Sequence, residues 1–252
     1  MKPTARTDHG DIYVFSDVQE LSHGAAQFVV EVAQRSIQQS GRFTFSLSGG
    51  STPRSLYRVL ASPEFRDRIP WSKLHLFWGD ERCVPPDHAQ SNYRMVNESL
   101  LSKVPIPAAN VHRMSAELPD HEQAAAEYEQ VLRDFFHLGD NALPRFDLLL
   151  LGLGQEGHTA SLFPGSAALS ETRRLVVTTY VEKFQSQRLS FTLPVINAAA
   201  EVAFLIAGEE KAEIVEQVFE NASVPAAQVR PTDGKLSWFF DRAAARKLPE
   251  AS

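Results

Sequence analysis

The chain contains a histidine that follows a glutamate by two residues within a glycine-rich segment, residues 152–165. This segment comes directly after an apolar run at residues 146–151. A histidine beside a carboxylate can take a proton from water near neutral pH and later return it to a leaving oxygen. The spacing therefore indicates His158 as a general base with Glu156 as its neighbouring carboxylate. The alternative is that the histidine only caps or packs.

The glycine spacing of the same segment also matches the GxGxxG pattern of a dinucleotide-binding turn. Such a turn opens a long helix, whereas Pro164 would break a helix that began near His158 after about two turns. The pattern also expects an acidic residue about 20 residues further on, and Glu182 lies somewhat late. We therefore interpret the segment as a site for proton transfer and reject dinucleotide binding.

A second polar segment, residues 48–53, follows another apolar run. Gly49 and Gly50 allow a tight turn in which successive N–H groups converge, and Ser51 and Thr52 stand before a helix start whose dipole favours an anion. This pattern predicts a phosphate site. The alternative is an ordinary strand-to-helix turn with a hydroxyl cap. A Walker loop is excluded because no Gly-Lys-Ser/Thr follows.

A third polar segment, residues 79–86, places Asp80, Glu81 and Arg82 directly after an apolar run. Charged groups at such a point must be paired or must face a solvent-filled cleft. A structural salt bridge and a functional site are both compatible with this pattern. The neighbouring Cys83 is interpreted as a packing residue because no obvious general base lies near it in the sequence.

The order of elements predicts where these three segments lie. Short apolar runs alternate with stretches of helical periodicity, which is typical of an α/β fold with a mainly parallel sheet and helices on both faces. Strands are expected at residues 11–15, 42–47, 73–78, 146–151, 175–181, 188–193, 201–207 and 236–240. Helices are expected at residues 17–39, 53–60, 91–101, 121–138 and 209–220. Ligands of such sheets bind beyond the carboxyl ends of the strands.

Two of these helices carry signals at their ends. Ser16 and Gln19 are placed to form a capping box at the start of the first helix, and Gly41 is placed to close it. Gly139 is expected to stop the fourth helix.

The bulk composition limits the class of protein. With 252 residues, 43% of them apolar, the chain can bury a sizeable core. No connection is long enough for a flexible linker, so we expect one α/β domain over residues 1–252 with a short polar tail at residues 1–10. A net charge of −6 argues against nucleic acid or anionic lipid as a partner. The lack of any apolar run approaching a membrane span of about 20 residues favours a cytoplasmic location.

Five segments, taken in order, resemble one known family. They are residues 48–53; residues 79–86 with Ser91, Asn92 and Tyr93; residues 152–164; residues 188–194 with Asn197; and Val229, Arg230 and Pro231 through Trp238 and Phe239. Ordered agreement over most of the chain is highly specific. The chain resembles the 6-phosphogluconolactonase family, the lactonase branch of a wider group that includes amino-sugar 6-phosphate isomerases and deaminases.

The resemblance implies a Rossmann-like fold and hydrolysis of 6-phospho-D-glucono-1,5-lactone to 6-phospho-D-gluconate in the pentose phosphate pathway, without a cofactor or metal. It also implies that His158 activates water and that residues 49–52 hold the phosphate. By the same likeness, Arg188 and Lys211 would be cationic partners of the phosphate, and Arg82 would lie close to the lactone.

The residue chemistry is compatible with these roles. Attack of water on the lactone carbonyl builds an oxyanion that Arg82 is able to stabilise. Glu156 or Asp80 would orient the imidazole, or Asp80 would instead fix Arg82. Two departures from the family pattern stand out. Glu156 occupies a position that is commonly aspartate, and residues 182–187 lack the prolines found in relatives.

Other functions have weaker support. A deaminase of the wider group would continue after the histidine with Asn-Glu-Pro, whereas residues 161–164 supply no acid. A non-catalytic sugar-phosphate sensor would usually carry a DNA-binding region, and no basic patch precedes the first strand. A serine hydrolase would need a Gly-x-Ser-x-Gly elbow, and a metal site would need paired histidines or cysteines. A monomer is the working expectation for the oligomeric state.

Overall fold

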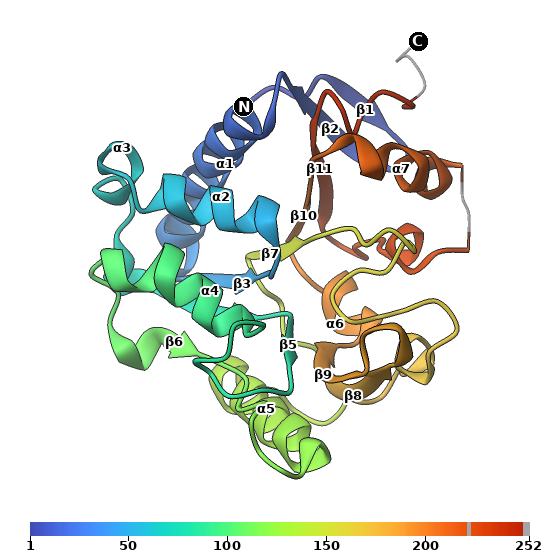
Figure 1. Ribbon diagram of the computed structural model, residues 1–252. Helices are drawn as coiled ribbons and strands as arrows, with labels where there is room; N and C mark the ends of the chain where they lie inside the picture. Colours follow the sequence, from blue (N-terminus) through green and yellow to red (C-terminus); the bar gives the residue numbers. More distant parts are fainter. Residues whose placement is uncertain (221–222, 249–252) are drawn as a thin grey trace.

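Eight strands form the central sheet within residues 1–220 and 223–248, which are the residues that the structure describes (Figure 1). In this computed structural model their order is β1-β2-β11-β10-β7-β3-β4-β6. All neighbouring pairs are parallel except β1 with β2. The strands are β1 Ala5–Thr7, β2 Gly10–Phe15, β3 Phe43–Leu47, β4 Leu74–Trp78, β6 Val111–His112, β7 Leu148–Leu151, β10 Glu201–Ile206 and β11 Lys235–Asp241. The mainly parallel sheet predicted from the sequence is confirmed.

A second, antiparallel sheet corrects the expectation for the remaining strands. It consists, in the described residues, of β5 Asp80–Arg82, β8 Val176–Val181 and β9 Ser186–Phe191, in the order β5-β9-β8. Strands were expected near β8 and β9, but as parts of the main sheet. Only residues 182–185 join them, and a parallel pair needs a crossover of about a dozen residues, so they pair as a hairpin.

Helices cover both faces of the central sheet. Figure 1 shows α1 and α2 on one side of β10 and β11, and α7 on the other. The helices are α1 Val18–Ser40, α2 Ser51–Leu60, α3 Pro63–Arg66, α4 Asn92–Ser99, α5 His121–Phe136, α6 Leu193–Asn197 and α7 Ala212–Phe219. Short 3-10 turns are η1 Trp71–Lys73, η2 Leu101–Lys103, η3 Ala108–Asn110, η4 Ala167–Ser170, η5 Glu182–Phe184, η6 Glu209–Lys211 and η7 Pro225–Gln228.

The start of α1 differs from the predicted capping box. Asp17 is the N-cap, and its Oδ1 accepts hydrogen bonds from the backbone N–H groups of Gln19 and Glu20, both at 2.9 Å. Ser16 donates its hydroxyl to Asp17 instead of capping the helix. A carboxylate at this position is a strong cap and also favours the helix dipole, which explains the shift by one residue. Gly41 closes the helix in the left-handed conformation, as predicted.

Two further expectations were wrong in detail. Helix α5 ends at Phe136, and His137 adopts the left-handed cap conformation with φ 52°, so Gly139 lies beyond the stop. The chain start was expected to be a polar tail, but Ala5–Thr7 forms the edge strand β1. This strand pairs with β2 through the tight turn before Gly10, whose φ is 109°.

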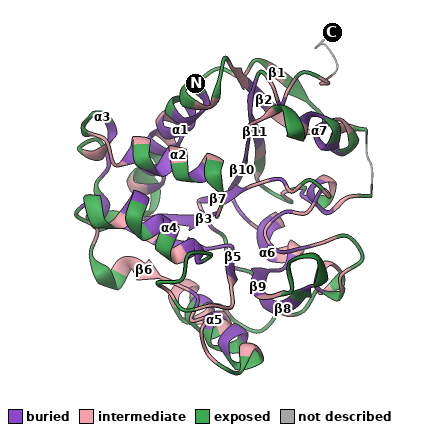
Figure 2. Cartoon of the chain, in the orientation of Figure 1, coloured by how far each residue is buried: buried purple, intermediate pink, exposed green. Residues whose placement is uncertain are grey.

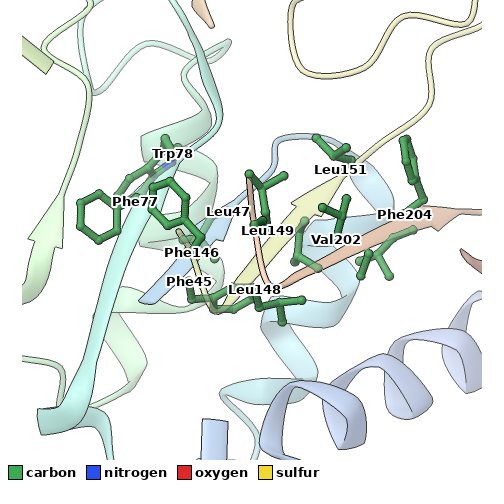
Figure 3. Close-up of a cluster of buried hydrophobic side chains, with 14 of the residues drawn as sticks. Phe45, Leu47, Phe77, Trp78, Phe146, Leu148, Leu149, Leu151, Val202 and Phe204 are labelled. Atoms are coloured by element: carbon green, nitrogen blue, oxygen red, sulfur yellow. The ribbon is translucent and has the colours of Figure 1, made fainter. Parts of the chain in front are cut away.

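The central strands are buried on both faces. Figure 2 shows the buried class concentrated on the strands and on the inner sides of the helices. Each of the four leucines of β7 is at most 1% exposed. Figure 3 shows this cluster around Phe45, Leu47, Phe77, Trp78, Phe146, Leu148, Leu149, Leu151, Val202 and Phe204. Burying one leucine side chain contributes about 2 kcal/mol to the stability of the fold. Because many such side chains lie on these strands, the cluster fixes the strand ends from which the polar segments start.

Candidate active site

One pocket lies at the carboxyl ends of the central strands. Strands β7, β3 and β4 are neighbours, and the segments that follow them line a cavity of about 430 Å³. All ten residues that the sequence predicted for the site line this cavity: Gly49, Gly50, Ser51, Thr52, Asp80, Arg82, Glu156, His158, Arg188 and Lys211. The fold therefore brings together five segments that lie far apart in the sequence.

His158 is largely buried beside the pocket, with 18% of its side chain exposed. Its Nδ1 lies 3.1 Å from Glu156 Oε2, and its ring stacks on Phe163 with the centroids 4.0 Å apart. Burial lowers the pKa of His158, while the hydrogen bond and charge of Glu156 act in the opposite direction. Because Nδ1 faces a carboxylate, Nε2 is the ring nitrogen left for proton transfer.

The backbone before His158 is folded tightly around its ring. A Cβ at Gly154 would lie 1.9 Å from His158 Cε1, so only glycine leaves room for the imidazole. The Gly154 N–H also donates to the His158 carbonyl at 2.8 Å. No helix begins within residues 152–165, all of which the structure describes. The segment therefore lacks the helix start that a dinucleotide pyrophosphate requires.

Glu156 divides its carboxylate between two partners. Oε2 faces the imidazole of His158, and Oε1 accepts a hydrogen bond from Lys183 Nζ. Burial by itself would raise the pKa of Glu156, but hydrogen bonds from Lys183, from the backbone and from His158 together lower it. Glutamate in place of the usual aspartate therefore still reaches the imidazole as an ionised group.

Asp80 does not hold Arg82, which was one of the two roles considered for it. Its Oδ2 accepts a hydrogen bond from the Ser161 hydroxyl at 2.7 Å, and Asn92 Nδ2 donates to its backbone oxygen at 2.9 Å. Its charge acts on His158, whose pKa it raises. Asp80 thus ties β5 to the histidine segment and to the start of α4, and leaves Arg82 for other partners.

Glu81 does not line the pocket and has a structural role. It is 3% exposed and accepts backbone N–H groups of Asn92 and Tyr93, each at 2.7 Å. The Ser91 hydroxyl donates to the same carboxylate at 3.2 Å. Burial raises the pKa of Glu81, with these hydrogen bonds opposing the shift. Glu81 therefore fixes the first turn of α4.

Two arginines face each other across the antiparallel sheet. Arg82 on β5 and Arg188 on β9 are register partners. In residues 1–220 and 223–248 neither guanidinium forms an ion pair with a carboxylate, and both Nε atoms are buried without a hydrogen-bond partner. Arg82 donates from Nη1 to the Gln90 carbonyl at 2.7 Å. Burial lowers the pKa of Arg188. Opposed like charges destabilise a sheet, so this pair favours binding of an anion.

The glycine loop opens toward the same pocket. Gly50, with φ 108°, is the N-cap of α2, and no side chain caps this helix start. The Tyr57 hydroxyl accepts the Ser48 N–H at 3.0 Å and donates to the Ser48 carbonyl at 2.8 Å, which holds the loop from behind. A Cβ at Gly49 would lie 2.0 Å from Asn92 Oδ1. The uncapped N–H groups and the helix dipole suit a phosphate.

Lys211, at the end of η6, brings an amine to the pocket. Its Nζ donates to the Leu153 carbonyl at 2.8 Å. This bond uses one of its three N–H donors and fixes the side chain beside the histidine segment, so the others are available to an anion.

Sequence reasoning did not assign a site role to three further pocket residues, Asn92, Lys183 and Phe184. Asn92 lay in a segment that matched the family, and its buried Oδ1 has no partner in the described structure. Lys183 and Phe184 lie at the tip of the β8–β9 hairpin, and only the unusual lack of prolines drew attention to this stretch.

Two features of the described residues bear on other classes of protein. Among residues 1–220 and 223–248, no group of three or more His, Cys, Asp and Glu side chains is arranged to hold a metal ion. In the same residues, no helix has both the length and the apolar character that crossing a membrane requires. Cys83 is half-buried, and burial raises the pKa of its thiol to about 12, as suits a packing residue.

The chain is similar to known proteins of one family. The sequence profile described as glucosamine-6-phosphate isomerases/6-phosphogluconolactonase matches residues 16–238. A 6-phosphogluconolactonase from a Nostoc species is 39% identical over 241 residues, covering 94% of this chain and 98% of that protein. One from a Synechocystis species is 44% identical over 218 residues, covering 85% and 88%. The solved 6-phosphogluconolactonase from Trypanosoma brucei has a TM-score of 0.85 at 31% identity and covers 98% of this chain and 99% of its own.

Proposed function

Because this chain belongs to the glucosamine-6-phosphate isomerase and 6-phosphogluconolactonase family, we propose that it hydrolyses 6-phosphogluconolactone to 6-phosphogluconate in the pentose phosphate pathway. The observation that carries the proposal is the shared pocket. A histidine paired with a carboxylate lies in the same cavity as an uncapped helix start and two arginines without carboxylate partners.

The reaction begins when Nε2 of His158 accepts a proton from water as the water oxygen bonds to the lactone carbonyl carbon. The carbonyl becomes an oxyanion, and the tetrahedral intermediate then breaks its bond to the ring oxygen. His158 returns the proton to that oxygen, which becomes a hydroxyl, while the former carbonyl carbon becomes a carboxylic acid. Glu156 stabilises the imidazolium that exists between the two proton transfers.

Such a substrate is charged at its phosphate and, during the reaction, at the oxyanion. Arg82 lies across β5–β9 from Arg188 and supplies positive charge for the oxyanion. The phosphate binds at the start of α2, where residues 49–52 offer backbone N–H groups and two hydroxyls. Arg188 and Lys211 complete its charge-assisted contacts.

The rival reaction, deamination of an amino-sugar 6-phosphate, would use an acid after the histidine for ring opening. That stretch contains Ser161, which is fully buried and donates to Asp80, and Phe163, which stacks on the imidazole. Neither side chain can supply a proton to a sugar ring. This favours the lactonase over the deaminase.

The test is to supply freshly prepared 6-phosphogluconolactone and to follow acid release above the spontaneous rate, with ammonia release from glucosamine 6-phosphate measured in parallel. Enzyme-dependent acid release without ammonia is expected. Ammonia release, or binding of either compound without turnover, would contradict the lactonase assignment. Equal hydrolysis of unphosphorylated gluconolactone would contradict the phosphate site.

We also propose that the chain acts as one domain and as a monomer in the cytoplasm, on a free phosphorylated sugar lactone and without a cofactor. The net charge of −6 disfavours binding to nucleic acid.

Light scattering after size exclusion tests the oligomeric state and is expected to give a mass near the 28.0 kDa of one chain. A mass of two or more chains would contradict the monomer.

A further inference from the structure

The tip of the β8–β9 hairpin reaches the pocket from the second sheet. Within η5, Lys183 pairs with Glu156, and the ring of Phe184 lies 5.3 Å from the guanidinium carbon of Arg188. Both residues line the cavity. One short segment thus contacts the group that orients His158 and one of the two facing arginines.

We propose that Lys183 is a positioning residue that acts on His158 through Glu156, an inference that rests on the proposed lactonase function. Glu156 offers one oxygen to the imidazole and the other to the ammonium. A carboxylate shared in this way stabilises an imidazolium less than one devoted to the histidine alone. Lys183 therefore keeps more of the His158 population neutral and able to accept a proton from water.

Charged groups from several elements surround His158. The charge of Lys183 acts on the imidazole through Glu156, which contacts both side chains. Glu156 and Asp80 raise the pKa of His158, whereas Arg188 lowers it. Arg82 and Lys211 line the same cavity. Asp80 already accepts a hydrogen bond from the Ser161 hydroxyl. The carboxylate whose interaction with the imidazole can change when Lys183 is removed is therefore that of Glu156.

Exposure sets the expected size of the effect. The Lys183 side chain is 58% exposed, whereas Glu156 is 30% exposed. Solvent screens an ammonium in such a position, so its removal is expected to shift the pKa of His158 by about half a unit rather than by several.

The first experiment is an NMR titration of the His158 ring, assigned by the loss of its signals in His158→Gln. In Lys183→Met the pKa of His158 is expected to rise by about half a unit. Lys183→Arg retains the positive charge and is expected to restore the original value. Lys103→Met removes an exposed lysine on η2 that does not line the pocket, and should leave the titration unchanged. An unchanged or lowered pKa in Lys183→Met overturns the proposal.

A double-mutant cycle tests whether the effect passes through Glu156. In a Glu156→Gln background the side chain no longer carries the charge that links the two groups. Adding Lys183→Met there is expected to shift the pKa of His158 by less than about 0.1 unit. If the full shift persists in this background, Lys183 acts on His158 directly and the proposed route is wrong.

Kinetics then connect the coupling to the reaction. The acid limb of kcat/KM in Lys183→Met should move to higher pH by the same half unit or so, with KM at high pH changed by less than about twofold. A shifted NMR titration without any lactonase activity in the parent protein would leave the coupling intact and refute the proposed function. Lactonase activity with an unshifted titration would refute only the role of Lys183.

Discussion

The imidazole of His158 receives two opposing influences on its charge. Burial against Phe163 favours the neutral ring, and the carboxylate of Glu156 favours the protonated ring. The net effect lowers the pKa below the ordinary 6.5. At pH 6.5 more than half of the molecules therefore hold a neutral imidazole, which is the form that a general base requires.

Replacing His158 by alanine tests the base directly. His158→Ala is expected to lower kcat by roughly 10²- to 10⁴-fold, because positioned proton transfer typically contributes that much. Binding of the product 6-phosphogluconate, measured by calorimetry, should stay within about threefold, because the phosphate contacts lie on other segments. Turnover close to that of the parent protein would refute the assignment of His158 as base.

The antiparallel sheet is the element that positions both arginines. It places Arg82 opposite Arg188, with each Nε buried and unpartnered in the described structure. Sequence patterns indicated a strand near each of β8 and β9 but could not show that these strands leave the main sheet. That outcome depends on the short connection at η5 and on pairing with β5, which the sequence presented as a polar loop. The sequence therefore could not predict that Arg82 and Arg188 lie opposite each other.

From this arrangement we expect Arg188 to aid substrate binding without stabilising the fold. Arg188→Met should raise KM for the phosphorylated lactone by about tenfold or more, because a charge-assisted contact is lost. The free energy of unfolding in urea should stay within about 1 kcal/mol or increase, because an unpaired buried charge and a like-charge pair are both removed.

Arg58→Met is the matched control, since Arg58 is exposed on α2. It should change neither KM nor the unfolding free energy appreciably. A loss of stability by 2 kcal/mol or more in Arg188→Met, on the order of a broken buried pair, would show that Arg188 has a structural partner.

The β4–β6 edge carries a pair of titratable rings. His75 Nδ1 lies 3.3 Å from His112 Nε2, and His112 stacks on Phe77 with centroids 4.4 Å apart. Burial, with the charge of His75 as the smaller cause, lowers the pKa of His112 to about 4. Between about pH 6.5 and pH 4 the unfolded chain thus binds more protons than the folded one, so this site loses stability as the pH falls.

His112→Phe keeps the aromatic stack and removes the titration. The parent protein should lose about 1 kcal/mol at this site between pH 7 and pH 5, a value reduced for the partial exposure of the ring. The variant should lose correspondingly less in urea unfolding at the two pH values. An equal loss in both proteins would place the acid sensitivity elsewhere.

At the scale of the whole molecule, segments at the carboxyl edge of the central sheet bring residues 49–52, Asp80, Arg82, Glu156, His158 and Lys211 into one pocket, and Arg188 joins them from β9 of the antiparallel sheet. The meeting of the three polar segments follows from sequence because the carboxyl ends of neighbouring parallel strands lie at one edge, whereas Arg188 and Lys211 were expected only from the family resemblance. Lys183 and Phe184 could not be found in this way, since they reach the pocket from a hairpin outside the main sheet. Asn92 was not predicted as a site residue for a different reason. It is the first residue of α4, and the sequence of a helix start does not indicate the direction of a side-chain amide.

A ligand that spans this pocket should stabilise both sheets together. The start of α2 and Lys211 belong to segments of the central sheet, whereas Arg82 and Arg188 belong to the antiparallel one. 6-Phosphogluconate at about 100 times its Kd should raise the free energy of unfolding by about 2.7 kcal/mol. Hydrogen exchange should slow at β5 and β9 as well as in residues 49–52. If protection is confined to residues 49–52 while the melting temperature rises, the ligand binds the glycine loop alone, and the arginine pair has no part in holding it.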